Sequence, residues 1–187
     1  MVLQLGTHIK DIHNVLITDE TLLKLLFYKA KNMNDDVTKT GARPNILGSK
    51  SPLVSGIGGA KEMNAAEIIS DVIKSTPKTN DLNMENAKCR VCHYLENTEK
   101  IVTNGSTSFT NAFQNLTFDV YVHTDYDASD FRATKVVDRI SNLIHNKAIT
   151  GIGKMSFEGI DRLDDGLKEG FEGYIGYRMK FRFMLLL

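Results

Sequence analysis

The chain has 187 residues, of which 42% are hydrophobic, and this composition predicts one domain around a single core rather than two domains. Lys plus Arg and Asp plus Glu both total 23, so the neutral bulk charge does not indicate nucleic acid or an acidic membrane as a partner. The stretch MVLQLGTHIKDIHNVL has no basic leader and no long apolar run. We therefore expect neither a signal peptide nor a membrane span there, and folding in a cytoplasm.

Two helices are predicted at the N-terminus. THIKDIHNVLI, residues 7–17, suits one helix, and Asp19 can cap a second, whose leucines and Phe27 give it a broad apolar surface. The second helix is predicted to end near Lys31, before the polar run NMNDD. The apolar residues of NAAEIISDVIKS, residues 64–75, suit a short helix or a strand, and both stay open.

A polar segment, residues 33–62, separates these elements. It is rich in Asn, Asp, Thr, Gly and Ser and contains Pro44 and Pro52, which predicts a long extended loop or arm on a single domain spanning 1–187. Its small apolar content leaves little to offset the entropy of ordering. We therefore expect this loop to be mobile in the isolated subunit and ordered by neighbours in an assembly.

The only two cysteines lie in AKCRVCHYLE, where Cys89, Cys92 and His93 have the C-x-x-C-H spacing of haem attachment sites. C-x-x-C alone also occurs in zinc sites and redox dithiols. Residues 88–96 have the composition of a strand. Its alternating side chains would form two faces: Cys89, Val91 and His93 on one, and Arg90, Cys92 and Tyr94 on the other. We predict two free, dispensable thiols in or beside a core; the alternative is a small cytosolic metal-binding module built on Cys89, Cys92 and His93.

The second half of the chain has the clearest patterns. LTFDVYVH, residues 116–123, alternates as a strand, and apolar residues at helical spacing predict a helix at about 128–147. ITGIGKMSFEGI predicts a glycine turn into a further strand, and YIGYRMKFRF is the most regular strand of the chain. The order strand, strand, helix, strand, strand predicts an α+β fold, with a mixed or antiparallel sheet and helices packed on one face.

Several polar residues resemble parts of catalytic or ligand sites. His123 and Asp125 could serve a metal-dependent hydrolase, although the sequence places no nucleophile near them, which favours a surface or packed histidine. Asp125, Asp127 and Asp130 could hold a hard cation, but carboxylates at the start of a helix more often cap its free N–H groups. SGIGGAK and TGIGKMS lack complete nucleotide-binding motifs and are interpreted as turns. We therefore predict no enzyme activity, no cofactor and no bound metal.

Opposite charges are segregated near the C-terminus. Three cations, Arg178, Lys180 and Arg182, alternate with apolar residues on the last strand, so they project from the face opposite the core. They follow an acidic segment that contains Glu158, Asp161, Asp164, Asp165, Glu169 and Glu172. These charges could pair within one chain, which is favoured, or between subunits placed head to tail in a ring.

A family resemblance rests on FDVYVHTDY, then RATKVVDRISNLIHNKAITGIGKMSF, then the acidic segment and GYIGYRMKFRF. In this order they resemble the tail terminator or tail completion proteins of long-tailed phages. DETLLKLLFYKAKNMNDD followed by PNIL is similar to the leaders of phage neck and tail components. The resemblance implies an α+β subunit without catalytic residues that forms a homo-oligomeric ring, a hexamer, on the finished tail tube.

The resemblance also implies the partners and location of the chain. The ring would contact the tail tube protein and a head-side connector or head completion protein, with DNA only as passing cargo and no membrane partner. The chain would be part of the virion, in the tail or neck, and would be in the host cytoplasm during assembly. The hypothesis that follows is a ring interface made by the two charged segments of neighbouring copies.

Overall fold

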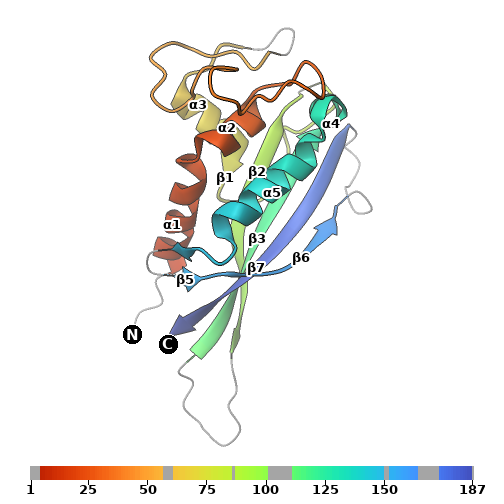
Figure 1. The fold of residues 1–187 in the computed structure, drawn as a ribbon. Helices are drawn as coiled ribbons and strands as arrows, with labels where there is room; N and C mark the ends of the chain where they lie inside the picture. The colour runs from red at the N-terminus through yellow and green to blue at the C-terminus, as the bar shows by residue number, and fades with distance from the viewer. Residues whose placement is uncertain are drawn as a thin grey trace, which may run out of the picture.

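A sheet of five strands, in the order β1-β2-β3-β7-β6, forms the centre of the computed structural model, which describes residues 5–56, 61–85, 87–100, 111–149, 152–163 and 173–186 (Figure 1). The strands of this sheet are β1 (Ile73–Lys74), β2 (Cys89–Lys100), β3 (Asn111–His123), β6 (Ser156–Arg162) and β7 (Tyr174–Leu186). β1 runs parallel to β2, and the other neighbouring strands are antiparallel. A short ribbon, β4 (Ala148–Ile149) with β5 (Gly153–Lys154), precedes β6. The predicted α+β fold with a mixed sheet is therefore confirmed.

The helices lie on one face of the sheet (Figure 1). They are α1 (Leu5–Ile17), α2 (Glu20–Phe27), α3 (Ala65–Val72), α4 (Thr124–Asp130) and α5 (Arg132–Ile144). The apolar faces of these helices, with Leu16 of α1 and Ile140 of α5 among them, join one buried cluster with the sheet residues Val91, Val120 and Met179. Among the described residues, no helix has the length and apolar character needed to cross a bilayer.

The faces predicted for the sheet strands are confirmed by their burial and register. On β3, Phe118 and Val120 are buried against the helices, and on β7 their cross-strand partners are Met179 and Tyr177. The intervening residues, such as Asp119 and Arg178, are also partners across β3 and β7 and point to the opposite face. We call this opposite face, which carries Asp119, Arg178 and Lys180, the polar face.

The helix predicted at about 128–147 is wrong in its boundaries, because two helices occupy this region. α4 begins at Thr124, and α5 begins after Phe131, which has a left-handed backbone (φ 56°, ψ 46°). Asp127 accepts a hydrogen bond from the N–H of Ala133 (2.8 Å), so a free donor in the first turn of α5 is satisfied at this break. The break also lets the adjacent Arg132 become fully buried while Phe131 is 62% exposed.

The N-terminal helices have the predicted cap but a different end. The Asp19 side chain accepts from the N–H of Leu22 (2.7 Å), as predicted. α2 ends at Phe27 rather than near Lys31, because Tyr28 is extended and the N–H of Lys29 bonds to the carbonyl of Ser55 (2.9 Å). The open choice at 64–75 resolves into α3, which has a capping box made by Asn64 and Glu67, followed by the two residues of β1.

The described part of the predicted loop, residues 33–56, contains no helix or strand, but it does not project as an arm. The Glu20 carboxylate of α2 accepts from the N–H groups of Ile46 (2.7 Å) and Leu47 (2.9 Å). Val37 and Ile46 are buried in the main core. A few apolar side chains and one carboxylate therefore fasten this polar loop to α2, which its overall composition did not reveal. Its mobility in the free subunit stays a prediction.

Candidate functional site

The two cysteines lie on opposite faces of β2, as predicted. Cys89 belongs to the main core, whereas Cys92 belongs to a smaller cluster with Leu82, Tyr121 and Tyr174. Both thiols are free and fully buried. Burial raises the pKa of Cys89 to about 12 and the pKa of Cys92 to about 11, so both are protonated at neutral pH and neither supplies a thiolate.

His93, the third member of the C-x-x-C-H motif, contacts a histidine of α1 instead of a cysteine. Its Nε2 lies 2.9 Å from Nδ1 of His13, and its side chain is fully buried beside Phe118. Burial, with a smaller effect from His13, lowers the pKa of His93 to about 4. Within the described ranges, no three His, Cys, Asp or Glu side chains gather closely enough to hold a metal ion. This histidine pair joins α1 to the sheet.

His123 and the neighbouring aspartates make helix-capping and ion-pair contacts. His123 Nδ1 accepts from the N–H of Asp125 (3.2 Å) at the start of α4, and its ring lies edge-on to Tyr174. Its Nε2 is 3.3 Å from the carbonyl oxygen of Met84. Asp127 bonds to Ala133, and Asp130 is fully buried between Arg132 and Lys135. These side chains are separately committed and do not converge on one reactive position.

The basic stripe on β7 is matched by carboxylates of the same chain. Arg178 donates through Nε (2.7 Å) and Nη2 (2.9 Å) to Asp119, which is only 1% exposed and also accepts from the hydroxyl of Tyr94 (2.9 Å). Hydrogen bonding to Asp119 raises the pKa of Arg178 far above its usual value. Arg178 therefore balances the charge of a buried carboxylate, and an interface role for it stays a prediction.

The other two cations of the stripe also have partners within the chain. Lys180 forms an ion pair with Asp161 of β6 (2.7 Å), and Arg182 lies 3.9 Å from Glu158 and bonds to Asn115. These three pairings agree with the favoured alternative, intrachain pairing. Asp164, Asp165, Glu169 and Glu172 lie outside the described residues.

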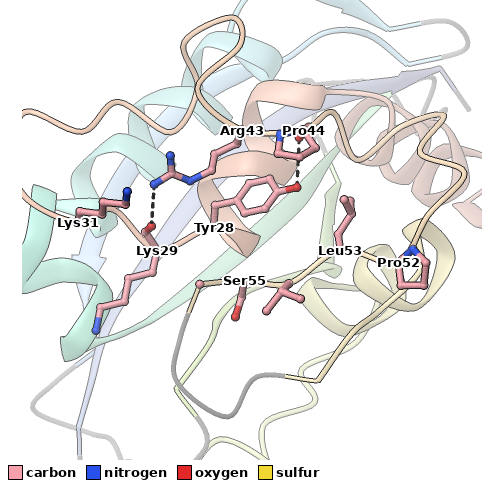
Figure 2. A pocket seen from close by; sticks show the side chains of 10 residues that line it. Tyr28, Lys29, Lys31, Arg43, Pro44, Pro52, Leu53 and Ser55 are labelled. Atoms are coloured by element: carbon pink, nitrogen blue, oxygen red, sulfur yellow. Dashed lines mark hydrogen bonds between the residues drawn. The ribbon is translucent and has the colours of Figure 1, made fainter.

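A surface pocket of about 440 Å³ lies where the chain leaves α2 (Figure 2). Two apolar residues, Pro52 and Val54, line it together with the cations Lys29, Lys31 and Arg43. Three segments, 28–31, 43–44 and 52–56, contribute to it. We call it the basic pocket.

Contacts between these segments hold the basic pocket open. Tyr28 donates from its hydroxyl to the carbonyl of Pro44 (3.2 Å), and Arg43 donates to Asp35 (2.6 Å) and to the carbonyl of Lys29 (3.4 Å) (Figure 2). Burial is the main reason that the pKa of Tyr28 is raised to about 12. The Tyr28 hydroxyl is therefore a fixed donor rather than a titrating group at neutral pH.

The break between α4 and α5 fixes the far side of this pocket. The buried Arg132 guanidinium donates to the carbonyls of Leu25 and Tyr28 (2.6 Å to Tyr28) at the C-terminus of α2, where a cation is favoured. The hydroxyl of Tyr126 donates to the carbonyl of Phe27 (3.2 Å). The backbone that carries Lys29 and Lys31 is thus clamped by residues about a hundred positions later in the sequence.

Comparisons with known proteins establish a family. The model of the YomW family matches residues 19–183. The chain belongs to the YomW family. It is 30% identical over 173 residues to the SPbeta prophage-derived uncharacterized protein YomW of Bacillus subtilis (strain 168), a match that covers 92% of each chain. A prophage-derived relative of nearly the same extent supports a phage origin.

Sequence reasoning about this YomW family member missed the basic pocket and the residue that clamps it. Lys29 and Lys31 stood out only as part of a predicted helix end, and Arg43 as part of a polar loop. Arg132 was expected on the polar side of a helix, yet it is fully buried. The nearest available signal was the pair Asp130 and Arg132, since adjacent opposite charges at a helix start can be buried together.

Proposed function

We propose that this chain is a structural virion protein that forms a ring at the end of the phage tail tube and joins the tube to the head-side connector. The phage origin of the family, the α+β fold with its mixed sheet and the resemblance in the second half of the chain support this proposal. In the ring, each copy contacts two neighbours through different surfaces, and the closed geometry sets the number of copies.

The observation that carries the proposal is the exposed apolar surface of the edge strand β6. Phe157 and Ile160 are cross-strand partners of the buried residues Phe181 and Met179, so they continue the core-facing side of the sheet. They are nevertheless 38% and 42% exposed. The helices do not extend over β6 (Figure 1).

A neighbouring subunit would remove this apolar surface from water. Apolar residues that continue a core face beyond its cover are typical of subunit contacts. Glu158 bulges from β6, and β6 is charged, which disfavours direct strand pairing, so the contact would be made by side chains. The alternatives, a metal-binding module or a hydrolase, have less support because Cys89, Cys92, His93, His123 and Asp125 are occupied in structural contacts.

The experiment measures the assembly of purified protein by light scattering and negative-stain electron microscopy. We expect closed rings for the wild type, hexamers by the resemblance. Ile160→Glu should give folded monomers, because a carboxylate would be buried at each contact. The control is Met33→Glu, which changes a side chain that is 62% exposed in the 33–56 loop. A wild type that stays monomeric, or rings that persist in Ile160→Glu, would contradict the proposal.

The location of the chain is tested separately in phage particles. Mass spectrometry should find the chain in purified particles, and labelling should place it at the head-proximal end of the tail. Deletion of its gene should give heads and tails that do not join. A chain that is absent from finished particles would exclude the proposed role.

A further inference from the structure

The basic pocket carries a positive charge that the described residues do not balance. Lys29, Lys31 and Arg43 line it, and Asp35 is the carboxylate in contact with Arg43, so three cations against one anion give a balance of +2. Among the described residues, neither Lys29 nor Lys31 forms an ion pair. Lys31 is exposed and Lys29 is half-buried. The pocket therefore favours an anionic ligand.

The lining of the basic pocket also defines an apolar requirement. Pro44, Pro52, Leu53 and Val54 line it, and Val54 is 44% exposed. A free inorganic anion would leave this surface uncovered, whereas a peptide with carboxylates and an apolar side chain would cover it. Because Arg132 and Tyr126 already fix the backbone of the pocket, binding would cost little ordering on this side.

The same chain contains a segment with the complementary chemistry. Residues 164–172, DDGLKEGFE, have four carboxylates against Lys168, a balance of −3, together with Leu167 and Phe171. This acidic segment follows directly after β6, which ends at Arg162. A neighbour that covers the exposed Phe157 and Ile160 would therefore also meet the acidic segment.

We infer that the basic pocket binds the acidic segment, residues 164–172, of a neighbouring copy. The inference rests on the proposed ring and specifies its two different surfaces: β6 with the acidic segment on one copy, and the basic pocket on the next. Such a contact joins copies head to tail, as a closed ring requires. Charge sets the orientation, and the apolar residues supply most of the affinity.

The test reverses the charges of each side separately. The pocket-reversed variant carries Lys29→Glu and Lys31→Glu, and the segment-reversed variant carries Asp164→Lys and Asp165→Lys. Each alone should assemble about tenfold more weakly than the wild type, because attraction becomes repulsion at two positions. An equal mixture of the two variants should recover assembly, since each reversed pocket meets a reversed segment.

The outcomes separate this inference from the proposed ring. A monomeric wild type overturns the ring and the inference together. A ring that forms normally in both variants leaves the proposed function intact and overturns the inference. Failure of the mixture to assemble, with recovery when all four substitutions are in one chain, shows that the segment occupies the pocket of its own copy. The matched control, Lys39→Glu with Lys50→Glu, reverses two exposed lysines of the loop that do not line the pocket and should assemble normally.

Direct binding gives a readout that does not depend on assembly. A labelled peptide with the sequence of residues 163–173, LDDGLKEGFEG, should bind the segment-reversed protein, whose pocket is intact, and bind the pocket-reversed protein about tenfold more weakly. A scrambled peptide of the same charge should bind less tightly than the native order if the apolar residues contribute. No binding of the native peptide, or a pocket that instead binds short DNA with the same dependence on Lys29 and Lys31, would overturn the inference.

Discussion

The basic stripe on β7 and the basic pocket contain three cations each, but their charges are used differently. In the stripe, Arg178, Lys180 and Arg182 each lie beside a carboxylate of the same chain. In the pocket, Arg43 has Asp35, while Lys29 and Lys31 form no ion pair among the described residues. The stripe is conspicuous in the sequence and the pocket is not. A regular pattern of charge in a strand therefore says little about which cations are available to a partner.

The difference follows from where the carboxylates are placed. β3 and β6 flank β7, and their outward residues supply Asp119 and Asp161 at the registers of Arg178 and Lys180. A strand in the middle of a sheet has neighbours on both sides that can neutralise its charges. The lysines of the basic pocket lie on an irregular segment after α2, where the backbone is held by Arg132 and few side chains are near. Their charges thus remain accessible.

The largest expected effect comes from removing the cation that balances a buried charge. Arg178→Met leaves the carboxylate of Asp119, which is 1% exposed, with only hydroxyl donors. We expect this variant to lose about 3 kcal/mol of unfolding free energy, measured by urea denaturation at neutral pH. Lys180→Met is the matched control, because it lies on the same strand and face but its partner is exposed. Equal losses in the two variants would show that Asp119 gains nothing from Arg178.

The histidine pair extends the comparison to potential cations that have no carboxylate. Burial lowers the pKa of His93 to about 4 in the folded protein, against about 6.5 in the unfolded chain. Between these values the unfolded state binds more protons, so stability is full above pH 6.5 and falls as the pH falls toward 4. We expect His93 alone to lower the unfolding free energy by about 2 kcal/mol between pH 7 and pH 5.

A variant without this titrating group isolates its contribution. Other groups also titrate in this range, so the informative quantity is the difference between wild type and His93→Leu in the change from pH 7 to pH 5, measured by urea denaturation. The variant should lose less stability on acidification than the wild type. His13, half-buried on α1, keeps its own lowered pKa in both proteins. Parallel losses in the two proteins would mean that His93 is not protonated on unfolding.

Periodicity in the sequence predicted most of the sheet, whereas contacts between distant residues decided the rest. The alternation around Val120 and Met179 was enough to assign both faces of β3 and β7. It could not show that Asp119 and Arg178 are partners, because that depends on the register between strands 59 residues apart. Phe131 gave no sign of a helix break, since its left-handed backbone is stabilised by contacts of Asp127 and Arg132. The basic pocket depends on the same clamp, so it too was out of reach.

The smallest effect on stability is expected where the two basic regions look alike, at exposed lysines. Lys180 is 46% exposed opposite an Asp161 that is 60% exposed, and Lys31 is exposed without an ion pair, so Lys180→Met and Lys31→Met should each move the melting temperature by roughly 2 °C or less. Binding of the peptide 163–173 should nevertheless distinguish them. Lys31→Met should weaken it and Lys180→Met should not, because Lys180 already has an anion and does not line the pocket. If both variants bound the peptide equally well, exposure alone would not identify the cations that meet a partner, and the contrast between stripe and pocket would have no functional meaning.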